Sequence, residues 1–181
     1  MPANKTVTFS RHCEVITVPG GDNIEIPEGT IGKITQALGS SFTVYIAGSL
    51  VRVAGKNADA IGQDVPQRLT LPEGATDEDV ERLIVAQLRQ VYDPEIPINL
   101  MDLGLIYECS VDHGDRRQRS VSVLMTLTAP GCGMGDIMID DVRTHLLEIP
   151  TITHVETEIV LEPPWEMEMM SDAAKLQLGM I

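Results

Sequence analysis

Residues 124–138, LMTLTAPGCGMGDIM, contain the change of pattern that decides the fold. The first part of this stretch continues an alternation that begins at Val121. Apolar side chains occupy every second position from 121 to 127, which is typical of a half-buried β-strand. Pro130 interrupts that alternation, and apolar residues then recur at helical spacing from Met134. A strand that turns sharply into a helix predicts a mixed α+β fold.

The remainder of the C-terminal half supplies the other elements of such a fold. Apolar positions at three- and four-residue spacing predict two amphipathic helices, and alternating positions predict three strands. The expected ranges are 77–92 and 134–148 for the helices, and 105–112, 120–128 and 154–161 for the strands. These elements form a small helix/sheet sandwich with both helices on one face of the sheet. Residues 162–181 are expected to be a separate, methionine-rich tail with one or two helical turns.

Residues 1–62 have a different pattern, in which short runs rich in Val, Ile and Thr alternate with glycine-containing turns. Short strands with frequent turns predict a β-rich, barrel-like or sandwich domain. Two prolines and a glycine between 63 and 75 indicate a linker, and Thr76 with Asp79 resembles the capping pair that begins a helix. We therefore predict two domains, 1–72 including the linker and 73–181.

The composition excludes several classes of function. The chain has 13 basic and 27 acidic side chains, a formal net charge of −14, which repels nucleic-acid phosphates and anionic lipid. We therefore expect no nucleic-acid partner and no membrane association. The first residues contain no apolar segment typical of a secretory signal. Three widely spaced cysteines do not form a disulfide framework, so a cytoplasmic protein with reduced thiols is expected.

Cys132 is the thiol with the most unusual sequence context. It stands among three glycines, just before the expected second helix, whose N-terminal amides would stabilise a thiolate. Thr126 and Thr128 are expected to point to one side of the preceding strand, toward the same space. Acidic residues early in the helix would disfavour the thiolate; they are Asp136, Asp140 and Asp141. The spacing alone is compatible with two interpretations of Cys132: a functional thiol, or a small buried residue packed in a tight turn.

A second cluster of candidate side chains lies in residues 93–107, DPEIPINLMDLGLIY. Two prolines restrict the backbone there, and the carboxylates of Asp93, Glu95 and Asp102 fall close together in the sequence. If this loop folds over Cys132, its carboxylates can bind a metal or act as bases. The alternative is that the DPE sequence only ends a helix and exposes its acids to water.

The other candidate residues are expected to have structural roles. Cys13 and Cys109 lie on predicted strands and are expected to pack in the core, and His145 and His154 are expected to be structural. The methionines at 167, 169 and 170 suggest a flexible apolar contact surface. The sequence contains no paired-cysteine motif, phosphate-binding loop or dinucleotide fingerprint.

The two motifs resemble those of the small iron–sulfur cluster assembly domain shared by SufT, PaaD-like proteins and eukaryotic cytosolic assembly factors. The family pattern is DPE, then a stretch similar to DLGLIY, then T-x-T-x-P-x-C. The matching residues here are Asp93, Pro94, Glu95, 102–107, Thr126, Thr128, Pro130 and Cys132. The resemblance covers about residues 76–162, and GTIGKITQALGSSFTVYIAG and PPWEMEMMSDAAKLQLGM outside it are similar to SufT-type sequences. Gly133 departs from the proline that many relatives have after the cysteine.

The resemblance implies a role in maturing iron–sulfur proteins, with Cys132 as the contact to iron or to a labile iron–sulfur cluster. Asp93, Glu95, Thr126 and Thr128 are the other residues that we expect around that contact. The implied partners are the iron–sulfur assembly machinery and client apoproteins. The implied protein is a carrier or accessory factor and not an enzyme.

The number of cysteines limits how the protein could hold a cluster. One cysteine cannot supply the four thiolates of a stable cluster, so a homodimer that brings two Cys132 thiols together is expected. Two alternatives stay open: a client-binding adaptor module without metal, and an enzyme that uses Cys132 as a nucleophile. The enzyme would need a base within reach, and no histidine belongs to a recognisable partner motif.

Overall fold

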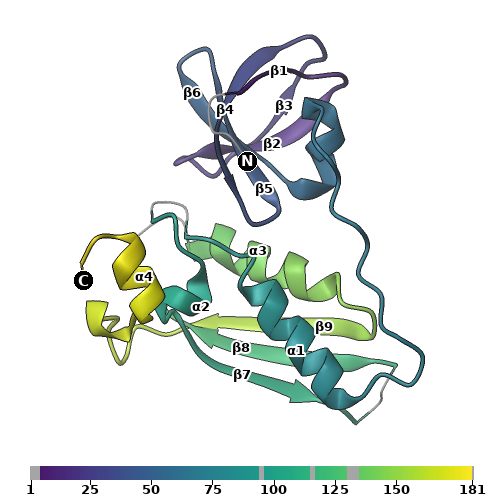
Figure 1. The fold of residues 1–181 in the computed structure, drawn as a ribbon, viewed down its shortest axis with the longest axis vertical. Coiled ribbons are helices and arrows are strands. Elements are labelled where there is room, and N and C mark those ends of the chain that lie inside the picture. The colour runs from purple at the N-terminus through teal and green to yellow at the C-terminus, as the bar shows by residue number, and fades with distance from the viewer. Residues whose placement is uncertain (1–4, 94–95, 115–116, 130–134, 181) are drawn as a thin grey trace. The chain divides into compact units, whose positions relative to one another are not determined.

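The computed structural model describes residues 5–93, 96–114, 117–129 and 135–180 of the chain (Figure 1). The chain divides into two compact units, Met1–Gln67 and Arg68–Ile181. Helices and two separate β-sheets occur in the described residues, which confirms the predicted mixture of helix and sheet. The predicted domain boundary at 72/73 stays a prediction, because the compactness of two units does not test whether each folds independently.

The first unit is built around one six-stranded antiparallel sheet. Its strands are β1 (Lys5–Thr8), β2 (Cys13–Val18), β3 (Asn23–Ile26), β4 (Ile31–Leu38), β5 (Ser41–Ile46) and β6 (Ser49–Val53). The order across the sheet is β1-β4-β5-β6-β2-β3, and a 3-10 helix, η1 (Gly55–Ile61), follows β6. Among the described residues no ladder joins the edge strands β1 and β3, so closure into a barrel stays a prediction.

Buried and exposed side chains alternate along these strands, and the buried ones form the core of the first unit. Val44 of β5 pairs with Ile34 of β4 and with Val51 of β6, and all three side chains are buried. Directly paired residues point to the same face of a sheet, so this row is part of the core. Cys13 is buried in the same cluster, as the sequence predicted.

The second unit combines a three-stranded sheet with helices. Its elements are α1 (Asp77–Leu88), α2 (Leu100–Leu103), β7 (Ile106–Asp112), β8 (Arg119–Met125), α3 (Gly135–Leu147), β9 (Ile152–Ile159), η2 (Met167–Met169) and α4 (Asp172–Gln177). The strand order is β7-β8-β9, with β7 antiparallel and β9 parallel to the central strand β8. Among the described residues no helix is both long and apolar enough to cross a membrane.

The helices α1 and α3 cover one face of this sheet (Figure 1). The buried face of β8 carries Val121, Val123 and Met125, which join one core cluster with apolar residues of both helices. A parallel neighbour requires a crossover connection, and α3 supplies it between β8 and β9. The predicted packing of two helices on one sheet face is therefore confirmed.

Helix α1 begins where the sequence predicts. The Thr76 hydroxyl accepts a hydrogen bond from the Asp79 amide (3.2 Å), and the Asp79 carboxylate accepts one from the Thr76 amide (2.8 Å). This reciprocal pair satisfies two amides that the first helical turn leaves without partners. The helix ends at Leu88, four residues before the predicted end, because Val91 turns away to accept a hydrogen bond from Leu100.

A bulge in β7 changes which of its side chains face the helices. The register with β8 shifts between Ile106 and Glu108, so Cys109 pairs with the buried Val123 and no longer shares a face with Tyr107. Cys109 nevertheless lies on an edge strand and is exposed. The expectation that Cys109 packs in the core is therefore wrong, because an edge strand has no neighbour to cover that position.

The C-terminal residues are not the separate tail that the sequence suggested. Met170 and Ala174 are buried in the core cluster of the second unit, and Trp165 packs against it. The two helical turns expected in the tail are present as η2 and α4. In Figure 1 this yellow segment lies beside α2, so it is an integral part of the second unit.

Candidate functional site

Two of the predicted site residues, Cys132 and Glu95, lie outside the described residues, as do Pro94, Pro130 and Gly133. The structure describes the residues that flank them on each side. Ala129 and Gly135 flank the segment with Cys132, and Asp93 and Ile96 flank Glu95. The structure therefore describes the candidate site only through these flanking residues.

Thr126 joins the two sequence motifs. Its backbone amide donates a 2.9 Å hydrogen bond to the carbonyl oxygen of Leu105, which belongs to the DLGLIY stretch. Thr126 is 1% exposed, whereas Thr128 is half-buried. β8 ends at Met125, so both threonines follow the strand and the predicted strand range 120–128 is three residues too long. The bond to Leu105 nevertheless holds the start of their segment beside the second motif.

Gly135 fixes the start of α3 against the end of the sheet. A Cβ atom at this buried glycine would lie 3.0 Å from the Ile159 side chain of β9 and 3.4 Å from that of Leu127. These contacts are tighter than most Cβ contacts, so a side chain at position 135 would require the end of the Ile159 side chain to shift. The segment between Ala129 and Gly135 thus connects the carboxyl end of β8 to the N-terminus of α3. The carboxyl ends of parallel strands are where ligands bind in many α/β proteins.

Asp93 makes hydrogen bonds to residues that follow Glu95 in the sequence. Its carboxylate accepts a 2.9 Å hydrogen bond from the Ile96 amide, and its own amide donates to the carbonyl oxygen of Ile98 at 3.1 Å. The residue is only 6% exposed. A buried carboxylate that caps a turn in this way fixes the backbone around it. Asp93 therefore orients the loop, and this role stands beside the predicted contact with metal.

Asp102 belongs to a helix cap. The Asn99 side-chain oxygen accepts a hydrogen bond from the Asp102 amide (2.9 Å), and the Asn99 amide group donates to the Asp102 carboxylate (2.7 Å). These bonds begin the short helix α2. The structure thus gives Asp93 and Asp102 different local partners, Ile96 and Asn99.

The two described thiols have surroundings that disfavour the thiolate. Burial raises the pKa of Cys13. Desolvation by neighbouring protein atoms, together with the charge of Glu81, raises the pKa of Cys109 even though that residue is exposed. A protonated thiol is a poor nucleophile and a poor metal ligand. Both thiols are therefore less readily ionised than an ordinary cysteine.

The histidines of the described chain divide into buried and exposed groups. His145 of α3 is buried, and its Nδ1 atom lies 3.2 Å from the side-chain oxygen of Gln87 in α1. This contact joins the two helices inside the core, which fits the structural role that the sequence suggested. His12 and His154 are exposed on strands or next to them.

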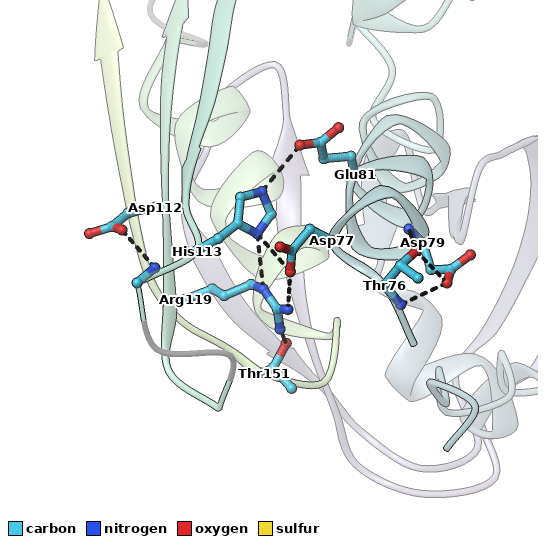
Figure 2. Close-up of polar contacts among 9 residues, drawn as sticks. Thr76, Asp77, Asp79, Glu81, Asp112, His113, Arg119 and Thr151 are labelled. Carbon is cyan, nitrogen blue, oxygen red and sulfur yellow. Dashed lines mark hydrogen bonds and ion pairs between the residues drawn. The ribbon is translucent and has the colours of Figure 1, made fainter. Parts of the chain in front are cut away.

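A polar cluster that the sequence did not predict lies at the opposite end of β8 (Figure 2). Arg119, at the start of β8, is 2% exposed and donates to the Asp77 carboxylate (2.7 Å) and to the Thr151 hydroxyl (2.7 Å). Its Nε atom donates to His113 Nδ1 (3.1 Å), and His113 Nε2 lies 3.1 Å from Glu81. Residues 113–119, HGDRRQR, are all polar or glycine, and only the pairing of strands reveals that Arg119 is buried.

The polar cluster holds together three places in the chain where a helix or strand begins. Thr151 has a φ angle of 81°, which is strained for a β-branched residue. Arg119 holds it twice, because the Arg119 amide also donates to the Thr151 carbonyl oxygen at 2.7 Å. The cluster therefore fixes the start of α1, the start of β8 and the turn before β9, some 20 Å along the strand from Thr126.

Comparison with known proteins identifies relatives of the second unit. The family model described as "Iron-sulfur cluster assembly protein" matches residues 81–159. The "Fe-S protein maturation auxiliary factor" of Porphyromonas gingivalis is 45% identical over 106 residues, which cover 59% of this chain and 93% of the relative. The "Fe-S protein maturation auxiliary factor SufT" of Staphylococcus aureus is 47% identical over 89 residues, covering 49% of this chain and 97% of the relative.

A solved structure agrees with these relatives. The crystal structure of a domain of unknown function, DUF59, from Bacillus anthracis is 33% identical, with a TM-score of 0.51. The match covers 57% of this chain and 95% of that domain. Sequence motifs, fold and relatives all agree, and the chain belongs to the SufT-like iron–sulfur cluster assembly protein family.

Proposed function

We propose that this protein is a maturation factor for iron–sulfur proteins, which holds iron or a labile cluster through Cys132 and helps to deliver it to client apoproteins. The observation that carries the proposal is the hydrogen bond from Thr126 to Leu105. This bond brings the segment leading to Cys132 beside the DLGLIY stretch. The printed names of the relatives, which are Fe–S protein maturation auxiliary factors, support the same role.

The proposed chemistry depends on incomplete ligation of the cargo. A thiolate at Cys132 would precede α3, whose N-terminal amides favour a nearby negative charge. One thiolate leaves most of the coordination positions of a cluster open to a second protein. A client with several cysteines then takes the cluster because it offers more thiolate ligands. The protein thus acts as a temporary holder, and we propose that it carries out no enzymatic reaction.

Asp93 and Glu95 have separate parts in the proposal. Asp93 holds the residues on either side of Glu95 through its hydrogen bond to Ile96, and we propose that the Glu95 carboxylate is a further ligand. Oxygen ligands bind ferrous iron less tightly than thiolate does, so they assist capture without preventing release. Thr126 and Thr128 would border the cargo on the other side.

We further propose that two copies associate, so that two Cys132 thiolates share one cluster between them. The proposed partners are client apoproteins and the iron–sulfur assembly machinery. The proposed setting is the cytosol, where thiols stay reduced. Light scattering at tens of micromolar protein, with and without ferrous iron, tests the association; a monomer under both conditions removes the shared cluster.

A second candidate function is an adaptor that binds clients without metal. The observation that favours it is the exposure of large apolar side chains on the C-terminal segment, with Met167 54% and Leu176 66% exposed. Exposed apolar residues that lie together are typical of protein contact surfaces. In this reading Cys132 would be dispensable for client binding.

Client maturation in cells that lack this protein separates the two functions. Cells expressing Cys132→Ser are compared with cells expressing Cys109→Ser, which removes an exposed thiol of the same unit. The carrier function predicts that Cys132→Ser lowers the activity of iron–sulfur client enzymes while their amounts stay constant, and that Cys109→Ser does not. Full client activity with Cys132→Ser rejects the carrier function and favours the adaptor.

A further inference from the structure

The sheet of the first unit packs one of its faces into the core and leaves the other face open. The strands β4, β5, β6 and β2 are consecutive neighbours in this sheet (Figure 1). Residues that alternate with the buried ones along these strands point away from the core. We call eight of them the outer face: Ile16, Val18, Ile31, Lys33, Thr43, Tyr45, Leu50 and Arg52.

The pairing of the strands makes the outer-face side chains neighbours. Lys33 of β4 pairs with Tyr45 of β5, and Tyr45 pairs with Leu50 of β6. Leu50 pairs in turn with Val18 of β2. Directly paired residues have Cβ atoms about 5 Å apart, so these four side chains form one row across four strands. Ile31 is a diagonal neighbour of Tyr45, within reach of an aromatic side chain.

Large apolar side chains of the outer face are exposed. Ile31 is 67% exposed, Tyr45 is 47% exposed and Leu50 is 36% exposed. Single exposed apolar residues are common on protein surfaces, whereas neighbouring ones mark contact surfaces. The opposite side of the same strands already supplies the core of the unit, so these outward apolar residues are not needed to build that core.

The outer face also differs in charge from the rest of the chain. The whole chain has 27 acidic and 13 basic side chains, whereas the outer face contains Lys33 and Arg52 and no acidic residue. Glu14, the next outward residue of β2, limits the face on that side. Arg52 donates a 3.2 Å hydrogen bond to the Ser41 hydroxyl. Lys33 is exposed and forms no hydrogen bond or ion pair with the other described residues, so its ammonium group is available to a carboxylate of another molecule.

We propose that the outer face binds a segment of another protein in which carboxylates stand beside large apolar side chains. The apolar side chains of that segment would cover Ile31, Tyr45 and Leu50, and one of its carboxylates would pair with Lys33. Tyrosine and arginine are enriched in protein contact surfaces, and the outer face contains both. The net charge of −14 disfavours a nucleic acid as the ligand. The outer face belongs to the first unit, so the proposal does not depend on the carrier function proposed for Cys132.

Selection of peptides on the full chain tests the chemistry of the partner. A phage-displayed library of short random peptides is selected on the immobilised wild type after depletion on the Tyr45→Ser variant. We expect the enriched peptides to combine Asp or Glu with large apolar residues. Enrichment of basic or purely polar peptides, or no enrichment over Tyr45→Ser, overturns the proposal.

Two matched pairs of variants test whether binding occurs on the outer face. Lys33→Glu and Lys56→Glu change the net charge equally, but Lys56 is an exposed residue of η1 outside the outer face. Leu50→Ser and Ile24→Ser remove side chains that are 36% and 38% exposed, and Ile24 pairs with the buried Val15. In calorimetric titrations of the strongest peptide, Lys33→Glu and Leu50→Ser should each bind about tenfold more weakly than the wild type. Lys56→Glu and Ile24→Ser should bind as the wild type does.

The remaining outcomes identify other occupants of the outer face. Equal losses of affinity within both pairs of variants show that the peptide binds elsewhere and overturn the proposal. Binding of a labelled single-stranded oligonucleotide that is lost in Tyr45→Ser makes the face a nucleic-acid site and also overturns it. A wild-type dimer that light scattering finds monomeric in Tyr45→Ser makes the face an interface between copies, with the same consequence. Loss of peptide binding in Lys33→Glu and Leu50→Ser with unchanged melting temperatures supports the proposal.

Discussion

The backbone amide of Thr126 donates a 2.9 Å hydrogen bond to the carbonyl oxygen of Leu105. These residues are 21 positions apart by their numbers, and each belongs to one of the two motifs that the sequence analysis selected. Both are buried, so the bond lies in the interior of the unit and is protected from competition by water. The proposed carrier function depends on this meeting of the two segments.

The close contact between Gly104 and Met169 predicts a large effect of Gly104→Ala. The substitution places a side chain in a left-handed backbone, which costs about 1–2 kcal/mol, and forces the C-terminal segment away. The emission of Trp165, the single tryptophan of the chain, should therefore shift to longer wavelength as the ring becomes exposed to water.

Gly74→Ala is the matched control for this experiment. Gly74 has a similar φ angle of 82°, but a Cβ atom there would meet nothing within 4 Å. This variant should lose stability through its backbone alone and keep the emission of the wild type. Equal emission spectra for the two variants would contradict the close contact at Gly104.

The polar cluster around Arg119 predicts a loss of stability that is distant from the candidate site. Arg119→Ala leaves Asp77, His113 and Thr151 without their shared donor, which should lower the free energy of unfolding by about 2–3 kcal/mol. Arg82→Ala removes an exposed arginine that pairs with Glu78 at 3.4 Å, and should cost no more than about 0.5 kcal/mol. Urea unfolding, followed by the emission of Trp165, measures the free energy of unfolding of both variants. A similar loss of stability in Arg119→Ala and Arg82→Ala would show that the cluster is not a structural anchor.

The cap of α1 predicts how stability changes in acid. Two hydrogen bonds from Thr76 lower the pKa of Asp79 in the folded chain. The backbone amide of Thr76 has the larger effect, and its hydroxyl group has the smaller one. A carboxyl whose pKa is lower in the folded than in the unfolded chain stabilises the fold above its unfolded pKa of about 3.9 and loses this effect as the pH falls. The wild type should therefore melt above Asp79→Asn at neutral pH, and the two melting temperatures should converge near pH 3. A constant difference over this range would contradict the assignment.

The sequence predicted the elements of the second unit because their apolar periodicity is strong. The cap at Thr76, the helix from Gly135 and the presence of the strand β9 all agree with the pattern. The errors occur where contacts distant in sequence override that pattern. The α1 helix ends early because Val91 bonds to Leu100. Cys109 is exposed because, among the described residues, no strand pairs with the outer edge of β7.

The sequence proposes the residues of the candidate site, and their contacts within the fold depend on segments that are distant in the sequence. The two motifs identified Asp93 and Thr126, and the structure places one in a turn and the other beyond a strand end. No local pattern indicated that Arg119 is buried or that Trp165 bonds to Leu103, because both depend on the meeting of segments far apart in the chain. Likewise, alternation of apolar residues indicates strands but does not determine whether a sheet closes into a barrel.

The binding of iron to Cys132 is the central claim, and anaerobic loading tests it most directly. The full chain is incubated with ferrous iron, sulfide and glutathione, and its visible absorption is recorded after removal of unbound iron. We expect charge-transfer absorption in the wild type, in Cys13→Ser and in Cys109→Ser, and its loss in Cys132→Ser, because serine is a far poorer ligand for a soft metal site. A colourless wild type, or an absorption that Cys132→Ser retains, would contradict the account.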